Sequence, residues 1–475
     1  MQGESNLKNK GIIYSYVAAD WIAAASAWTS LYFLRKKFEA IKYGYDLGFH
    51  TDTNFFAALI FIPLGWICFY AMWGMYSDVL RRHRLREIGQ ILATSLIGNT
   101  VIFFLFLLDD ELPNYNYYYT TFGFLLLAHL GLTLLLRVII TSRTVKKIQS
   151  RQWGFPTVIV GGNTRAMQLY DEISELKKSP GFQFKGYLKI NGADEQLSAS
   201  LPLFGKYPSL PAIIEEHHIE EVILSIESGD HKELENILAL LENYNVRINI
   251  IPDTFDILSG NVKMTSIFGV PLIRLNTLLM PSWQFSIKRI LDIVFSAIAL
   301  VILSPLLLII SALVKSTSHG SIFFFQERIG RNGVPFQIIK FRSMCTDAEK
   351  LGPQLSSTHD SRITKFGKFL RKTRFDELPQ FWNVLAGDMA LVGPRPERQF
   401  YIDQISKINP HYQKLHRIRP GITSWGQVKY GYAENVEEMV QRLRYDLLYL
   451  ENMSLAMDIK ILFYTVVIVL KGSGK

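Results

Sequence analysis

Two adjacent carboxylates, Asp376 and Glu377, stand directly before Leu378-Pro379 and a segment with helical spacing of apolar residues. Proline is favoured in the first turn of a helix and aspartate at its cap, so we expect Asp376 at a helix N-terminus. Such a position keeps a carboxylate ionised and attracts phosphate. Asp376 could then attack phosphorus while Glu377 holds Mg²⁺ against a diphosphate. Acidic residues in the first turn of a helix more often serve only as caps, so the Asp-Glu pair alone does not identify a catalytic site.

Basic side chains lie close to this pair in the sequence. Arg328, Arg331, Lys340 and Arg342 surround an apolar segment that we interpret as a strand. Lys, Arg and Mg²⁺ all spread the negative charge that develops on phosphoryl oxygens during transfer. The region therefore predicts a phosphate-binding site that uses Mg²⁺ as cofactor.

The composition indicates a membrane protein. Apolar residues make up 49% of the 475-residue chain, and the formal net charge is +9. Beside apolar spans, a basic balance favours anionic lipid or phosphorylated substrates over nucleic acid as partners. We interpret residues 1–145 as a four-helix transmembrane bundle. Transport paths usually contain ionisable residues within the spans, but the centres of these spans contain almost none apart from Asp20. We therefore expect the bundle to serve as an anchor. The four predicted spans are residues 12–34, 55–76, 88–108 and 118–140.

Basic residues also predict the orientation of the bundle. They are concentrated in the loop between the second and third spans (Arg81, Arg82, Arg84 and Arg86) and after the fourth span, whereas DDELPNYNYYY between the third and fourth spans has none. The positive-inside rule places both ends of the bundle in the cytoplasm. Basic residues 35–37 and 42 after the first span disagree with this orientation.

A fifth apolar run, residues 290–314, lies between basic flanks and contains Ser304-Pro305. Proline inside a helix removes a hydrogen bond and forces a bend. A full crossing would export the many basic residues that follow, so we predict a re-entrant helix over residues 288–314 that breaks at Ser304 and Pro305; a kinked span is the alternative. The last apolar segment, residues 457–472, suits a helix on the membrane surface.

Residues 150–278 alternate apolar strand patterns with amphipathic helices, which predicts a parallel, Rossmann-like α/β domain. Its glycine turn is incomplete, because Gly161 fits the dinucleotide motif but Asn163 and Ala166 fill the next two glycine positions. We favour a structural, regulatory or dimerising role, and we expect a homodimer. Tight binding of a nucleotide is the alternative.

Residues from about 288 to the C-terminus resemble the bacterial sugar transferase family, the monotopic phosphoglycosyl transferases. The resemblance is carried by the basic-flanked helix with Ser304-Pro305, followed in the family's order by QERIGRNGVPFQIIKFRSM, LRKTRFDELPQFWNVLAGDMALVGPRP and RIRPGITSWGQV. The whole chain is similar to the large members that prime exopolysaccharide, capsule or O-antigen synthesis. Residues 284–475 are then the catalytic α/β domain, with the re-entrant helix and surface amphipathic helices, on the cytoplasmic face of a bacterial inner membrane.

The resemblance implies transfer of a hexose-1-phosphate from a UDP-sugar to undecaprenyl (polyprenyl) phosphate, with release of UMP. Asp376 corresponds to the aspartate that forms a phospho-sugar intermediate, and Glu377 to its acidic partner at the Mg²⁺ site. Lys340, Arg342 and Arg395 lie in the family strings KFRSM and GPRP, which implies contacts with phosphate or nucleotide. The predicted substrate- and phosphate-binding set is Arg328, Lys340, Arg342, Arg371, Arg395 and Gln427.

Two departures from the family pattern concern the donor sugar, which the sequence does not identify. Arg374-Phe375 replaces the usual Ser-Leu before the carboxylates, and VKYG follows Gln427 where many members have Asn-Gly.

A competing function is a membrane-anchored nucleotide-sensing or scaffold protein of polysaccharide export. The incomplete glycine turn argues against it, and the intact DELPQ and GPRP strings have no purpose in it.

Overall fold

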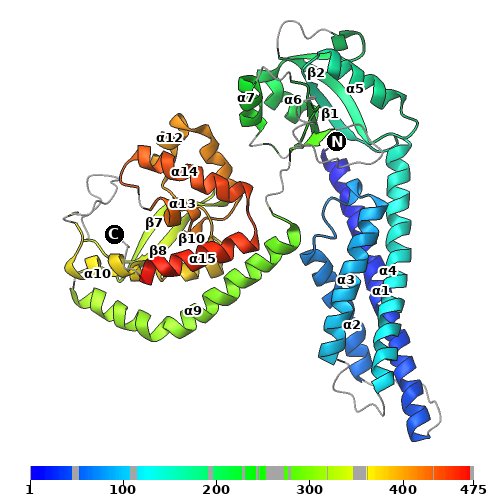
Figure 1. The fold of residues 1–475 in the computed structure, drawn as a ribbon, viewed down its shortest axis with the longest axis horizontal. Coiled ribbons are helices and arrows are strands. Elements are labelled where there is room, and N and C mark those ends of the chain that lie inside the picture. Colours follow the sequence, from blue (N-terminus) through cyan, green and yellow to red (C-terminus); the bar gives the residue numbers. More distant parts are fainter. Residues whose placement is uncertain are drawn as a thin grey trace. The chain divides into compact units, whose positions relative to one another are not determined.

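The chain divides into two compact units, Met1–Leu275 and Asn276–Lys475, both drawn in Figure 1. Each is a computed structural model. The structure describes residues 2–44, 53–106, 115–190, 196–226, 231–241, 244, 246–252, 272–275, 280–317, 319–345, 360, 362–431 and 433–470.

The first unit begins with four long helices, one for each of the four predicted spans (Figure 1). By length and composition, α2, α3 and α4 can each cross a membrane. The helix α1 is 42 residues long and carries Asp20. The second predicted span runs past its helix, because α2 ends at Met72 and a turn at Gly74 follows. The bounds are α1 Gln2–Tyr43, α2 Thr53–Met72, α3 Arg84–Phe106 and α4 Tyr115–Gln149.

Asp20 of α1 is paired inside this bundle. Arg137 of α4 places Nη2 2.6 Å from Oδ2 of Asp20 and Nη1 2.9 Å from Oε1 of Glu87. The Tyr76 hydroxyl donates to Asp20 at 2.6 Å. A buried charge is tolerated when it is paired and hydrogen-bonded. The cluster adds Arg137 to the ionisable residues within the predicted spans, and the role of the bundle as an anchor stays a prediction.

A parallel sheet follows the bundle, in the order β3-β2-β1-β4-β5-β6, and only β6 among its described strands is antiparallel to its neighbour. Apolar faces of α6 and α7 pack on one layer of core, and α5 contributes to another. The predicted alternation of strand and helix is therefore present. The bounds are β1 Phe155–Val160, α5 Thr164–Glu175, β2 Phe182–Lys189, β3 Leu203–Lys206, α6 Leu210–Glu216, β4 Glu221–Leu224, α7 His231–Leu241, β5 Arg247–Ile250 and β6 Ile273–Arg274.

Asn163 occupies the start of α5, where the dinucleotide motif would have glycine. Its Oδ1 accepts the Ala166 N–H at 3.1 Å, and its Nδ2 donates to the Ser225 carbonyl at 3.1 Å. The side chain thus caps the helix itself. This occupies the place where a pyrophosphate would approach the backbone.

The loop between α2 and α3 contacts the sheet. Arg81 lies 3.1 Å from Glu220 and 3.2 Å from Glu221, and its guanidinium lies over the Phe155 ring at 3.8 Å. Arg247 pairs with Asp78 at 2.6 Å. The basic character of Arg81 therefore serves contacts within this unit, in addition to any preference for the cytoplasmic side.

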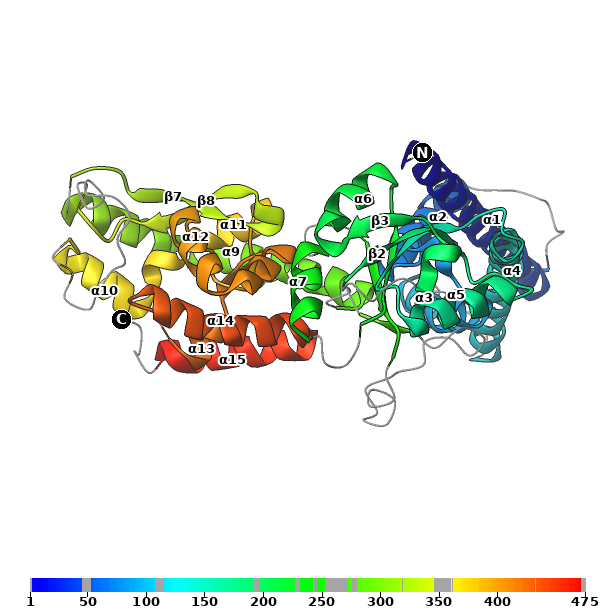
Figure 2. The same cartoon turned by 90° about the horizontal axis from the view of Figure 1, so that it is seen from above.

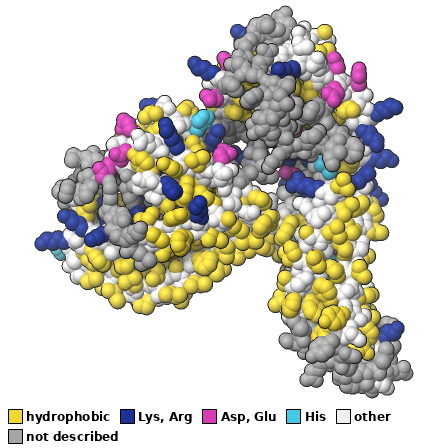
Figure 3. Space-filling view, viewed as in Figure 1, with side chains coloured by type: hydrophobic (Ala, Val, Ile, Leu, Met, Phe, Trp, Pro, Cys, Tyr) yellow, Lys and Arg dark blue, Asp and Glu magenta, His cyan; other side chains and the backbone are white. Residues whose placement is uncertain are grey.

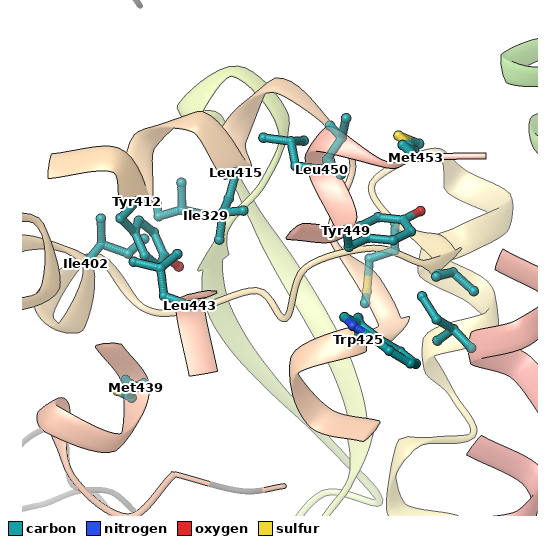
Figure 4. Packing of buried hydrophobic residues seen from close by; sticks show 14 of the residues in the cluster. Ile329, Ile402, Tyr412, Leu415, Trp425, Met439, Leu443, Tyr449, Leu450 and Met453 are labelled. Carbon is teal, nitrogen blue, oxygen red and sulfur yellow. The ribbon is translucent and has the colours of Figure 1, made fainter. Parts of the chain in front are cut away.

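The second unit surrounds one apolar core, part of which Figure 4 shows around Trp425, Tyr449 and Leu450. Figure 2 shows the β7–β8 ribbon along one edge of this unit and helices α13, α14 and α15 along the opposite edge. The bounds are α9 Ser282–Thr317, β7 Phe323–Ile329, β8 Pro335–Phe341, α10 Lys365–Thr373, η5 Phe375–Glu377, α11 Gln380–Ala386, β9 Ala390–Val392, α12 Gln399–Ile408, η6 Pro410–Arg417, β10 Gly421–Thr423, α13 Trp425–Lys429, α14 Val436–Glu451 and α15 Leu455–Leu470.

The fifth apolar run forms the 36-residue helix α9, which continues through Pro305 and is bent along its length (Figure 1). By length and composition it can also cross a membrane. Near its start Lys288 pairs with Asp458 of α15 at 2.6 Å, and near its end Ile310 packs in a cluster with Phe341. Both ends of α9 are thus attached to the second unit. Apolar side chains cover its outer face (Figure 3).

Candidate active site

Asp376 and Glu377 lie in the short turn η5, between α10 and α11. Both side chains are buried, with 8% and 9% of their surface exposed. The N-cap of α11 is Pro379 and has no side-chain hydrogen bond, so the predicted capping role of Asp376 is wrong for α11. The reason is local. Arg374 adopts a left-handed conformation (φ 60°) that ends α10, and the chain makes a 3₁₀ turn before α11 begins.

Four cations surround the two carboxylates. Lys340 Nζ lies 2.8 Å from Glu377 Oε1, Arg395 lies 3.6 Å from the same atom, and Arg374 lies 3.8 Å from Oε2. Arg371 acts electrostatically on Asp376. The four cations outnumber the two carboxylates, so the site retains positive charge for an anionic ligand. The structure thus brings together five of the predicted residues, and it adds Arg374.

The pKa values of the two carboxyl groups are shifted in opposite directions. Burial, followed by the charge of Glu377, raises the pKa of Asp376 to about 6, against the opposing effect of Lys340 and the neighbouring arginines. Burial alone would raise the pKa of Glu377, but Lys340, Arg395 and Arg374 hold it well below its usual range. Two adjacent acids with divergent pKa values are typical of catalytic sites.

Asn383 of α11 fixes the strand that carries Lys340. Its Oδ1 accepts the Ile339 N–H at 3.0 Å, and its Nδ2 donates to the Gln337 carbonyl at 2.8 Å. The Asn383 side chain is buried, and both of its bonds to the strand are partly buried. We did not single out this residue from the sequence. A polar residue amid the apolar helical pattern FWNVL was the available signal.

Close backbone contact positions the loop that carries Arg395. Gly393 N–H donates to the Thr423 carbonyl at 3.0 Å, and Gly421 N–H donates to the Pro394 carbonyl at 2.9 Å. A Cβ at Gly421 would lie 2.1 Å from the Gly393 nitrogen, so a side chain cannot be accommodated there. The glycines in GPRP and RPG therefore allow two loops to meet beside the site.

Arg328 and Arg342, which were also predicted, lie farther from the two carboxylates in their contacts and have supporting positions. Arg328 donates to the Pro396 carbonyl at 3.1 Å and pairs with Glu397 at 3.2 Å, so it supports the Arg395 loop. Glu397, which we also did not predict, is shared with Arg442 at 2.6 Å. Arg342 is buried beside the strand end.

A cavity of about 120 Å³ opens beside Glu377. Its lining includes Gln427, the remaining member of the predicted set, together with Arg374. Most of the other side chains on its wall are apolar. They are Leu378, Phe381, Ile422, Val428 and Ile468, with Thr423 and Thr465 between them.

The carboxylate oxygens of this site suit a Mg²⁺ ion that is bound partly by the protein and partly by the substrate. Among the described residues, no group of three or more His, Cys, Asp or Glu forms a complete metal site. Mg²⁺ in phosphate-transferring sites takes one or two carboxylates and completes its shell with phosphate oxygens and water. Asp376 and Glu377 are two adjacent buried carboxylates and fit that requirement.

Family-level comparisons match both parts of the chain. A sequence model described as bacterial sugar transferase matches residues 283–472, and one described as CoA-binding domain matches residues 71–252. The first range includes every residue of the site described above.

Three similar proteins illustrate the relationship. The UDP-N-acetylgalactosamine-undecaprenyl-phosphate N-acetylgalactosaminephosphotransferase of Aeromonas hydrophila is 40% identical over 51% of this chain and 56% of that protein. The UDP-glucose:undecaprenyl-phosphate glucose-1-phosphate transferase of Klebsiella pneumoniae is 35% identical over 62% of this chain and 64% of its own length. An enzyme of the latter name from Caulobacter vibrioides is 42% identical over 38% of this chain and 68% of that protein. The matched part of the chain thus spans less than two thirds of the first two relatives.

Proposed function

This chain belongs to the bacterial sugar transferase family, and on that premise we propose that it transfers a sugar-1-phosphate from a UDP-sugar to undecaprenyl phosphate. The observation that carries the proposal is the buried pair of Asp376 and Glu377 with Lys340, Arg371 and Arg395 around it, inside the region that the family model matches. Relatives named for this reaction with different sugars support it. The donor sugar itself is left open.

The first step forms a covalent intermediate. A carboxylate oxygen of Asp376 attacks the β-phosphorus of the UDP-sugar, and the bond from that phosphorus to the bridging oxygen breaks. UMP leaves with the bonding electron pair, and the sugar phosphate remains on Asp376. The cationic side chains bind the diphosphate and stabilise the charge that develops on its oxygens. Mg²⁺, held by the carboxylates and the diphosphate, would supply further neutralisation of that charge.

The second step regenerates the carboxylate. An oxygen of undecaprenyl phosphate attacks the same phosphorus, the bond to Asp376 breaks, and a polyprenyl diphosphate sugar is released. Asp376 must be ionised to act as a nucleophile, and a pKa of about 6 leaves most of it ionised at neutral pH. Glu377 is kept ionised by its cationic neighbours and is the more suitable group to hold a cation.

We further propose that α9 enters and leaves the membrane on the cytoplasmic side. This is supported by the attachment of both its ends to the catalytic unit, through Lys288 and Ile310. Its outer face exposes apolar side chains along much of the helix, as expected for contact with lipid. This arrangement places the nucleophile where it can meet both a cytoplasmic nucleotide sugar and a lipid phosphate.

UMP release tests the proposal. Purified full-length chain in bilayer nanodiscs, given undecaprenyl phosphate and a panel of UDP-sugars, should release UMP. Asp376→Asn should lower the rate by about 10³-fold or more, since the nucleophile is lost. Asp403→Asn, on exposed α12 and paired there with Gln399, is the matched control and should retain the wild-type rate.

Two results of this assay would contradict the proposal. Retention of a tenth of the wild-type rate by Asp376→Asn would remove Asp376 from the nucleophile role. Full activity in excess EDTA would exclude the divalent cation, since chelation should stop UMP release and added Mg²⁺ should restore it.

A further inference from the structure

The helix α10, which precedes the carboxylate pair, carries a stripe of basic side chains. Its sequence KFGKFLRKT contains four basic residues and no acidic one. Lys365, Lys368 and Lys372 are exposed, and Phe369 among them is 50% exposed. Spacings of three and four residues place these four side chains on one face of the helix. We refer to these four residues as the lysine stripe.

A second face attaches α10 to the helix α9. Phe366 and Leu370 pack in one apolar cluster with Ile310 and Val314, which lie in the half of α9 that follows Pro305. The same half of α9 also exposes apolar side chains on its outer face (Figure 3). The lysine stripe therefore lies on a helix that borders the surface for which we propose contact with lipid.

A third face of α10 belongs to the active site. Arg371 donates to Ser343 Oγ at 2.9 Å and acts electrostatically on Asp376. The ion pairs of Glu377 are made by other cations, none of which comes from the lysine stripe among the pairs of the described residues. The active site therefore accounts for Arg371 but leaves the charge of the lysine stripe without a role.

Charge and polarity together define the partner of the lysine stripe. Three lysines on a helix that has no acidic residue favour an anionic partner. A soluble anion would give Phe369 no apolar contact, whereas the boundary between lipid headgroups and acyl chains suits a phenylalanine. Lysines at that boundary extend their stems along apolar groups and place their ammonium groups among the lipid phosphates. Basic side chains in this setting attract acidic phospholipids.

We propose that the lysine stripe docks α10 on the headgroups of anionic phospholipids, with Phe369 at the level of the first acyl-chain carbons. The proposal goes beyond the transfer reaction, and it builds on the proposed contact of α9 with lipid. α10 leads through Arg374 directly into η5, so this docking also holds the carboxylate pair at the membrane surface. The content of anionic lipid in the bilayer then governs how firmly the pair is held there.

Fluorescence quenching in the full chain tests the proposal. The dye NBD is attached to a cysteine at Thr373, one turn after Phe369, in a chain whose two native cysteines are replaced. Nanodiscs contain phosphatidylcholine alone or equal parts of phosphatidylcholine and phosphatidylglycerol, and a little spin-labelled phosphatidylcholine quenches any dye that touches the bilayer. Quenching should be strong with phosphatidylglycerol and weak without it. In about 1 M salt, where the Debye length is about 3 Å, the difference should vanish.

Substitution of the three lysines separates the effect of charge from that of apolar contact. A lysine near an anionic surface contributes about fivefold to binding, so their combined loss should lower the ratio of docked to undocked α10 by about 100-fold. The triple variant is Lys365→Gln, Lys368→Gln and Lys372→Gln. The control removes the same charge at exposed lysines outside α10 and should be quenched like the wild type. Its positions are Lys177, Lys178 and Lys407.

Two results would overturn the proposal. A wild-type chain that is quenched in neither kind of nanodisc would show that the lysine stripe faces water or an acidic protein. Equal quenching in both kinds, unchanged in the triple variant, would show an apolar contact in which the lysines have no part. The comparison of the two lipid compositions needs no substitution in the lysine stripe, so it decides the matter even if the triple variant does not fold. UMP release is measured separately, so a failure of the proposed function would not alter the quenching result.

Discussion

Asn383 provides the sharpest test of how this site is assembled. It lies on α11 and holds two backbone groups of β8 on either side of Ile338. Asn383→Leu keeps the branched outline of the side chain, with somewhat larger end groups, but removes both the donor and the acceptor. The Ile339 N–H and the Gln337 carbonyl then lose these partners, in a place that is only partly buried.

The structure allows the cost to be worked out. A polar group that loses its partner in a fully buried place costs about 1–3 kcal/mol, but Ile339 is half-buried and Gln337 is exposed, so the free energy of unfolding of the second unit should fall by only about 1–2 kcal/mol. Lys340 is one residue beyond Ile339, and its Nζ pairs with Glu377 at 2.8 Å. Loss of the strand attachment should therefore also reduce UMP release. Asn383→Asp retains the acceptor, but it buries a carboxylate against the Gln337 carbonyl and near Asp388, so it should be destabilised at least as strongly as Asn383→Leu.

Thermal inactivation of the full chain in nanodiscs, followed by residual UMP release, measures both effects. Asn452→Leu is the matched control, because the Asn452 side chain is exposed and donates to the Leu448 carbonyl at 2.9 Å, where water can replace it. We expect its inactivation temperature to stay near that of the wild type. If Asn383→Leu is as stable and as active as this control, the reasoning that α11 positions β8 through Asn383 is refuted.

Two further predictions concern protonation and topology. Because the raised pKa of Asp376 is about 6, the carboxylate is lost as the pH falls through that value, and UMP release should drop about tenfold per pH unit below it; a flat profile down to pH 5 would exclude an ionised Asp376 as the nucleophile. Single cysteines at Ser282 and Ser321, in a chain whose two native cysteines are replaced, flank α9 and should both resist an impermeant maleimide in intact spheroplasts. Labelling at Ser321 alone would show that α9 crosses the membrane.

Much of the site could be predicted from the sequence because its residues occur in short strings with distinctive chemistry. Asp376 and Glu377 are adjacent, and the strings KFRSM and GPRP supply Lys340 and Arg395. The parallel alternation in the middle of the chain and the helices of the bundle follow from hydrophobic periodicity. The homodimer stays a prediction, which the mass of the purified protein would test.

The supporting contacts could not be predicted because they join residues far apart in the sequence. Asn383 contacts a strand 44 residues earlier, and Arg442 reaches Glu397 across 45 residues. Asp376 lies just before α11, as expected for a helix N-terminus, but it does not cap that helix. Local preference places aspartate at a cap, but Arg374 in a left-handed conformation ends α10 and inserts a turn before α11.

The short helix α11 links α9, which we propose enters the membrane, to the carboxylate pair. Arg289 of α9 donates to the Val384 carbonyl at 2.9 Å, near the C-terminal end of α11. A cation is favourable at that end of a helix, and Asp376 and Glu377 lie just before the other end. α11 has seven residues and is therefore about 10 Å long. Because Arg289 of α9 contacts one end of it and the carboxylates precede the other end, the length of α11 sets the separation between α9 and the carboxylates. The depth of α9 in the membrane would then determine the height of the nucleophile above the lipid surface, which is the property that a phosphate on a lipid carrier requires.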